Sequence, residues 1–148
     1  MSQSLAQNVI HLIFSTKNRR PLIVPELRDT LFAYMAGTLR EIQCPALEIG
    51  GVADHVHILF ALSKNLNVAS AVEEVKKSSS KWAKPNGSPE FYWQAGYGAF
   101  SVSASSEEKV VDYIRRQGEH HRATTFQDEY RKFLRKHRIE WDERYVWD

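Results

Sequence analysis

The hydrophobic residues of this chain follow two periods, one typical of strands and one typical of helices. Residues 9–15 and 54–62 are apolar and rich in β-branched side chains, so each is predicted to form a buried strand. Residues 25–42 and 67–82 instead repeat apolar side chains every three or four positions, which predicts two amphipathic helices. Pro25 suits the first turn of one helix, and Asn67 is a suitable N-cap for the other.

Two further segments complete the predicted sheet. Residues 46–52 form a short apolar run that ends in two glycines and leads into residues 54–62, which predicts a hairpin. Residues 91–102 are aromatic and interrupted by glycines, and we expect one or two strands there. The order strand, helix, strand, strand, helix, strand predicts an α+β fold of the ferredoxin-like (RRM-like) βαββαβ class, an antiparallel sheet with helices on one face.

The pattern after this core is helical. Residues 106–121 begin with serines and an acidic first turn, and residues 126–137 carry an aromatic stripe. We therefore expect a single domain over 1–148, with a core at about 8–103, a helix at about 106–121 and a helical tail at about 126–148. A chain of 148 residues is long enough for one domain with a substantial core.

Composition narrows the class of protein. Hydrophobic residues make up 43% of the chain, which is ordinary for a folded globular domain. No apolar run is long enough for a membrane helix, and the first residues lack the features of a signal peptide. Cys44 is the only cysteine, so we expect a small buried side chain and neither an intrachain disulfide nor a nucleophile. These features together predict a cytoplasmic protein without a membrane partner.

Charge is informative only locally, because the net charge is just +2. Lysines outnumber acidic residues between positions 64 and 84, and a basic turn follows the first predicted strand. Both groups are candidates for phosphate contact, although a solvated surface explains them equally well. The candidate DNA-binding residues are Lys17, Arg19, Arg20, Lys76, Lys77 and Lys81.

His55 and His57 are the first candidate site residues. Residues two apart in a strand share a face, so the two imidazoles point the same way and can hold one metal ion. A pair of this kind is weak evidence by itself. Asp54 is expected to close the hairpin turn rather than to orient a histidine. His11 is expected to be a hydrogen-bonded interior residue and not a ligand.

Tyr113 and Gln117 add a possible chemistry. They are four residues apart on a predicted helix, so their side chains share a face. The amide oxygen of Gln117 is an acceptable third ligand for a divalent cation. Tyr113 would then be a nucleophile that forms a covalent phosphotyrosine with a phosphodiester. His120 and His121 follow on the same helix, where contact with DNA and a frayed helix end are both open.

The chain resembles a known family in its order of motifs. These are HLIFSTK at 11–17, DHVHIL at 54–59, KSSSKW at 77–82, WQAGYGAFSV at 93–102 and YIRRQ at 113–117. In this respect the sequence is similar to the HUH-type single-tyrosine transposases of bacterial and archaeal insertion sequences. These are the TnpA-like proteins, which have the REP-associated tyrosine transposases as close relatives.

The resemblance implies a transposase that acts on single-stranded DNA carrying hairpins. His55, His57 and Gln117 would bind Mg²⁺ or Mn²⁺, and Tyr113 would take the 5′-phosphate of the cut strand. The family also implies a homodimer, with Tyr113 serving the histidines of its own or of the other subunit. The alternatives are a host-domesticated HUH nuclease acting on repeated palindromes, a relaxase-type or replication-initiator nuclease, and a non-catalytic RRM-like nucleic-acid-binding module.

Overall fold

One antiparallel sheet organises the protein, whose computed structural model describes residues 2–148. Its strand order is β2-β3-β1-β4, with every neighbouring pair antiparallel. The strands are β1 (Asn8–Ser15), β2 (Ala46–Val52), β3 (His55–Leu62) and β4 (Gly98–Val102). This is the ferredoxin-like α+β arrangement, so the predicted fold class is confirmed.

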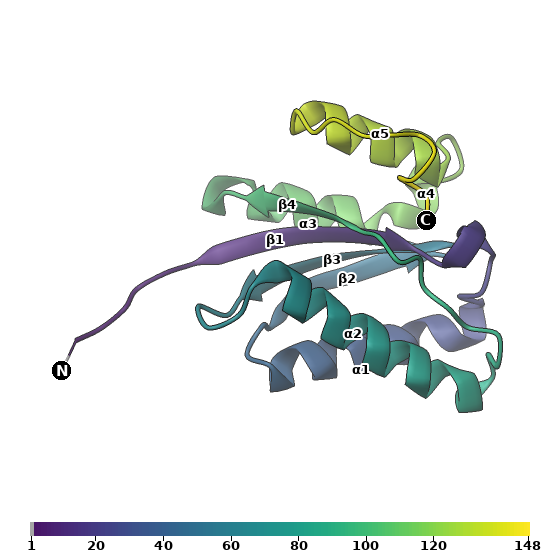
Figure 1. Ribbon diagram of the computed structural model, residues 1–148, viewed down its shortest axis with the longest axis horizontal. Coiled ribbons are helices and arrows are strands. Elements are labelled where there is room, and N and C mark those ends of the chain that lie inside the picture. Colours follow the sequence, from purple (N-terminus) through teal and green to yellow (C-terminus); the bar gives the residue numbers. More distant parts are fainter. Residues whose placement is uncertain (1) are drawn as a thin grey trace.

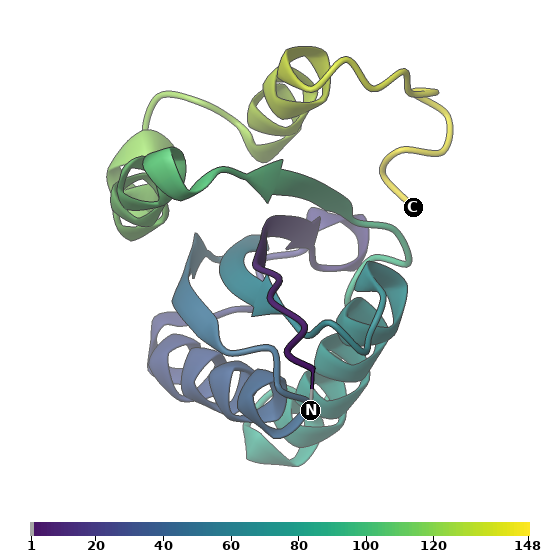
Figure 2. The ribbon, with the colours of Figure 1, turned by 90° about the vertical axis from the view of Figure 1, so that its left-hand side faces the viewer.

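Helices cover both faces of the sheet (Figure 1). The two helices within the βαββαβ core lie side by side on one face, as Figure 2 shows from the end of the sheet. They are α1 (Pro25–Glu41) and α2 (Val68–Ala83). Three later helices lie on the opposite face: α3 (Glu107–Arg115), α4 (Gln117–His120) and α5 (Phe126–Lys136). Short 3₁₀ turns cover Lys17–Arg19, Lys84–Asn86 and Ala104–Ser106.

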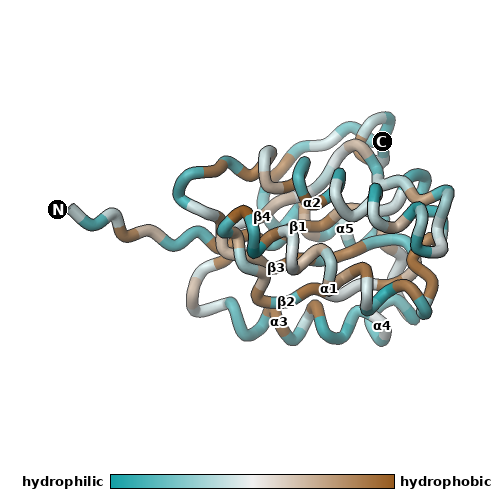
Figure 3. The backbone as a smooth tube through the Cα atoms, turned by 90° about the horizontal axis from the view of Figure 1, so that it is seen from below, coloured by the Kyte–Doolittle hydropathy of each residue, from teal (hydrophilic) through white to brown (hydrophobic). Residues whose placement is uncertain are grey.

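The alternation of side chains along β1 divides the core between these two layers. Leu12 and Phe14 point toward α1 and α2 and belong to the main apolar cluster. Val9 and Ile13 point the other way, toward α3 and α5 respectively. The change between hydrophobic and hydrophilic residues along the chain can be followed in Figure 3. His11 lies on the second face, between two apolar neighbours.

The local predictions hold in part. Asn67 caps α2 by accepting a hydrogen bond from the Ser70 backbone, and Cys44 is fully buried. The helix predicted over residues 106–121 is instead two helices, because Arg116 leaves the helical conformation (φ −96°, ψ 20°). This break turns Gln117 into the interior, where its side chain is only 1% exposed.

The segment predicted as strand from residue 91 is regular only from Gly98 onward. Residues 91–97 form a loop with one isolated bridge, between Thr16 and Trp93. The backbone of this loop is held by hydrogen bonds to several segments: the Gln94 amide donates to the Ser15 carbonyl of β1, the Lys76 amine donates to the Gln94 carbonyl, and the Gly96 amide donates to the Asp148 carbonyl. Among the residues described, no helix is both long enough and apolar enough to span a membrane.

Candidate metal centre

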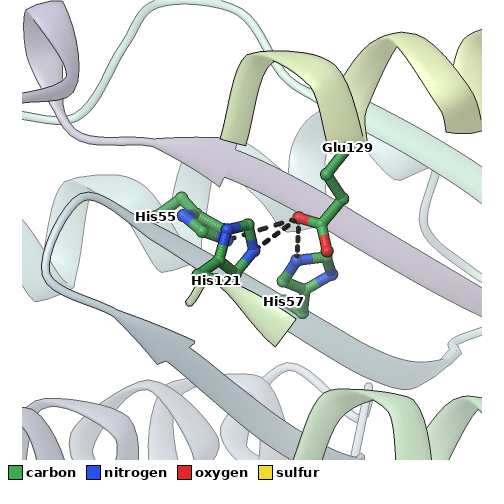
Figure 4. A group of neighbouring side chains, drawn as sticks. All are labelled: His55, His57, His121 and Glu129. Carbon is green, nitrogen blue, oxygen red and sulfur yellow. Dashed lines mark hydrogen bonds and ion pairs between the residues drawn. The ribbon is translucent and has the colours of Figure 1, made fainter. Parts of the chain in front are cut away.

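His55 and His57 project from β3 into the layer beneath α5, and neither side chain is exposed to solvent. Their positions follow from the alternation of the strand, as predicted. The Nε2 atom of His57 lies 3.0 Å from Oε1 of Glu129, and the Nε2 atom of His55 lies 3.4 Å from the same oxygen. Figure 4 shows both imidazoles turned toward this carboxylate of α5.

Glu129 is the residue at which the site converges. Its side chain is 2% exposed, and its Oε1 atom also lies 3.1 Å from Nε2 of His121. One ligand atom each from His55, His57, His121 and Glu129 lie within 4.8 Å of one another, so these four residues can hold a metal ion. The donor set of imidazoles and a carboxylate fits a divalent transition-type cation.

Tyr113 and Gln117 reach the same carboxylate. The Tyr113 hydroxyl donates a hydrogen bond to Oε2 of Glu129, and the Gln117 amide nitrogen lies 3.4 Å from that oxygen. The amide oxygen of Gln117 lies 3.2 Å from Nε2 of His55. The tyrosine ring is 5.7 Å from the His57 ring of its own chain, centroid to centroid. The four residues predicted for the site are therefore neighbours in a single chain.

Two residues hold the imidazoles from behind. Asp54 lies in the two-residue turn between β2 and β3, as predicted, and its Oδ1 atom is also 2.7 Å from Nδ1 of His55, the contact that the sequence analysis had not favoured. Because Asp54 directly precedes His55, its carboxylate can fold back onto the ring. Nε2 of His11 is 2.8 Å from Nδ1 of His57, which confirms the prediction of a hydrogen-bonded interior histidine.

His121 is not a frayed, exposed end, because its side chain is only 10% exposed and packs into the site. Its Nδ1 atom donates to the Thr124 carbonyl at 2.7 Å, and its other nitrogen faces Glu129. His120 remains partly exposed, and its nearest nitrogen is 3.9 Å from Glu129.

Two glycines of the sheet let the site's helices approach closely. A Cβ atom at Gly50 of β2 would lie 2.4 Å from the Ile114 carbonyl of α3, next to Tyr113. A Cβ atom at Gly98 of β4 would lie 2.8 Å from the Tyr130 ring of α5, next to Glu129. Side chains at these two positions would hold both helices away from the histidines.

Burial and close contacts shift the pKa values of the titratable side chains in the site. Burial lowers the pKa of His57 to about 4. Burial also opposes ionisation of Glu129, yet the surrounding side chains of His121, His55 and His57 outweigh it and hold the pKa of that carboxyl well below its usual range. Burial and the neighbouring Glu129 charge raise the pKa of the Tyr113 phenol above its ordinary value. The phenol therefore keeps its proton in this arrangement.

The candidate DNA-binding residues lie in two separate places. The turn carrying Lys17, Arg19 and Arg20 lies beside the β2–β3 turn, since the Thr16 amide donates to the Asp54 carbonyl at 2.9 Å. It is therefore at the end of the sheet where β3 begins with His55.

The lysines of α2 lie on the opposite face of the sheet from Tyr113. Lys77 and Lys81 are exposed there. The amine of Lys76 is instead engaged by three backbone carbonyls, those of Gln94, Ala95 and Gly96, and burial lowers its pKa to about 8. Lys76 thus holds a loop in place.

Glu129 was not predicted as a site residue, although its position in the hydrophobic pattern is unusual for a charged side chain. It lies three residues after Phe126 and four before Phe133, which places a carboxylate on the apolar stripe of α5. A charged residue on a buried helix face is rare unless it is paired.

The fold and the site define a small α+β protein whose sheet carries a cluster of metal-binding side chains beside a tyrosine hydroxyl. Residues 4–117 match the protein family described as "Transposase IS200 like", and the chain belongs to that family. It is thus an enzyme of the transposase class. A comparison with curated proteins found no match.

Solved structures share the fold. A putative transposase from Deinococcus radiodurans R1 is 20% identical, with a TM-score of 0.63 over 79% of this chain and 98% of that one. A REP-associated tyrosine transposase bound to a REP hairpin is 17% identical, with a TM-score of 0.62 over 82% of this chain and 74% of that one.

Proposed function

We propose that this transposase cuts and rejoins single-stranded DNA through a covalent link to Tyr113, with a divalent metal held by His55, His57 and Gln117. The observation that carries the proposal is the convergence of the Tyr113 hydroxyl with these three side chains in one buried site. The family membership supplies the reaction class, and the site supplies groups suited to phosphodiester chemistry.

In this reaction the Tyr113 oxygen forms a bond to the scissile phosphorus, and the bond from phosphorus to the 3′ oxygen breaks. The departing oxygen takes up a proton and becomes a 3′-hydroxyl, while the 5′-phosphate stays on the tyrosine. The phenol proton is lost to solvent as the bond to phosphorus forms, while the Glu129 carboxylate holds the hydroxyl in position by accepting its hydrogen bond. A later attack by another 3′-hydroxyl on the phosphotyrosine restores a phosphodiester and frees the phenol, so no external energy source is needed.

A bound divalent metal supplies Lewis-acid polarisation of the scissile phosphate. His55, His57 and Gln117 would hold it through two imidazole nitrogens and an amide oxygen. Because imidazole is a softer ligand than Mg²⁺ prefers, we expect Mn²⁺ to support the reaction at least as well as Mg²⁺. Asp54 and His11 act on the ring nitrogens that face away from the centre and fix the orientation of both imidazoles.

The substrate in this proposal is single-stranded DNA with a hairpin near the cut. The hairpin is suggested by the structural neighbour that is bound to a REP hairpin, and the basic turn at residues 17–20 lies at the histidine end of the sheet to receive phosphates. Moving an insertion sequence and processing repeated palindromes would use the same chemistry. DNA hairpins flanking the gene on both sides would favour the first of these roles, the movement of an insertion sequence.

The direct test is adduct formation. Purified protein with Mn²⁺ and a hairpin-bearing single-stranded oligonucleotide should yield a covalent protein–DNA species that resists denaturing gel electrophoresis. Tyr113→Phe should lose it, because the substitution removes only the hydroxyl. Tyr34→Phe is the matched control, since Tyr34 lies on α1, on the other face of the sheet. A Tyr113→Phe protein that still forms the adduct would refute the assignment.

A further inference from the structure

Two side chains of the candidate metal centre come from the chain beyond residue 117, where the family match ends. We propose that Glu129 and His121 complete the metal centre as additional ligands, and that the Glu129 carboxylate also holds Tyr113 beside the metal. This inference rests on the proposed function, since it adds protein ligands to the same ion. The catalytic centre would then depend on the tail helix α5 as well as on the sheet.

Several hydrogen-bond acceptors in the site, imidazole nitrogens and side-chain oxygens, face one another. The Thr124 carbonyl can only accept, so Nδ1 of His121 carries a proton and Nε2 of the neutral ring presents a lone pair. That lone pair points at Oε1 of Glu129, 3.1 Å away. In the same way the Asp54 carboxylate fixes the proton of His55 on Nδ1.

Nε2 of His55 therefore faces two acceptor oxygens, those of Gln117 at 3.2 Å and Glu129 at 3.4 Å. Acceptors converge without repulsion only if a cation or additional protons lie between them. A metal ion lying between them satisfies all of these atoms together.

The spacing of the donor atoms also fits one ion. Oε1 of Glu129 is 3.0, 3.1 and 3.4 Å from the Nε2 atoms of His57, His121 and His55. Ligands bonded at about 2.0–2.2 Å to one metal lie roughly 3.0–3.5 Å apart when adjacent in an octahedral or tetrahedral shell. A single carboxylate oxygen thus stands at ligand spacing from three imidazoles at once.

The other oxygen of the same carboxylate accepts the Tyr113 hydroxyl. Glu129 therefore links the donor set to the proposed nucleophile through one rigid group on one helix. Its position is fixed by apolar contacts of α5, because Phe126 and Tyr130 on either side of it are buried against the sheet. Three imidazoles and a carboxylate favour Mn²⁺ over Mg²⁺ more strongly than two imidazoles and an amide would.

Mn²⁺ binding to the purified full chain tests this inference without DNA, by titration calorimetry or by the electron paramagnetic resonance signal of free Mn²⁺. Glu129→Gln keeps the volume of the side chain but removes its charge, and should weaken Mn²⁺ at least about tenfold. Asp128→Asn is the matched control, because it removes a charge from the neighbouring, exposed position of α5 and should leave the affinity unchanged.

His121→Asn is a second variant, because its amide can still donate to the Thr124 carbonyl but lacks the Nε2 ligand; it should weaken Mn²⁺ as well. Thermal unfolding followed by circular dichroism verifies that each variant is folded. Unchanged or tighter Mn²⁺ binding by folded Glu129→Gln would overturn the inference. It would mean that the carboxylate occupies the metal position instead of binding the metal. In that case, loss of binding in His57→Ala would leave the proposed function intact, whereas a wild-type protein that binds no Mn²⁺ would refute both.

Discussion

Gly50→Ala tests how closely α3 must approach the sheet for Tyr113 to reach the histidines. The new Cβ would lie 2.4 Å from the Ile114 carbonyl oxygen and 2.8 Å from its Cγ2 atom, where ordinary contacts begin at 3.4 Å. The helix must therefore retreat by about 1 Å. Overpacking of this kind costs about 1–3 kcal/mol, which exceeds the roughly 0.4–1 kcal/mol gained by restricting the unfolded chain.

The net loss is then at most about 2.6 kcal/mol, and at roughly 2–4 °C per kcal/mol for a domain of this size the unfolding temperature should fall by up to about 10 °C. A displacement of about 1 Å at the nucleophile should also slow formation of the Tyr113–DNA adduct by about 100-fold. The two effects are measured by circular dichroism melts and by single-turnover adduct formation at a temperature where the variant is folded.

Gly37→Ala is the matched control, because Gly37 lies inside α1 with open space around it. Alanine is favoured over glycine in a helix interior by about 0.5–1 kcal/mol, so this variant should be slightly stabilised and fully active. The reasoning about close approach is wrong if Gly50→Ala melts at the wild-type temperature and forms the adduct at the wild-type rate.

Three further experiments test the metal site, the sharing of the site between subunits and DNA binding. His57→Ala should slow cleavage at least about 100-fold, measured on denaturing gels, while hairpin binding in gel-shift assays stays largely unchanged; parallel loss of binding would count against a metal role. Because Tyr113 lies beside its own chain's His57, mixing Tyr113→Phe and His57→Ala proteins should not restore activity, and restoration would show a site shared between subunits. Lys17→Ala should reduce the slope of log affinity against log salt by about 0.7, the contribution of one single-strand phosphate contact, and Lys81→Ala on the opposite face should not. Equal slopes for the wild type, Lys17→Ala and Lys81→Ala would mean that Lys17 of the basic turn does not contact a DNA phosphate.

The parts of the site that follow from local geometry were predictable. The strand period places His55 and His57 on one face, and the spacing of four residues brings Tyr113 and Gln117 together despite the break at Arg116. The order of strands and helices was enough for the sheet because most segments have a clear hydrophobic period; the exception is residues 91–102, where only Gly98–Val102 forms a strand.

The rest depends on contacts between distant segments. Glu129 meets the histidines only because α5 packs across the sheet, and hydrophobic periodicity does not specify that packing. The break at Arg116 likewise serves a tertiary contact, the insertion of Gln117 beside His55. The contact between Asp54 and His55 was not predicted, because an aspartate in a turn can either bond to the turn backbone or orient a neighbouring histidine, and only side-chain geometry separates the two.

The proposed mechanism requires a specific chemical bond between protein and DNA, and mass spectrometry of the digested adduct identifies that bond directly. We expect a nucleotide attached through its 5′-phosphate to the peptide containing Tyr113, with the modification assigned to the phenolic oxygen. Attachment to any other residue, or cleavage that leaves no modified peptide under conditions that preserve phosphotyrosine, would contradict it.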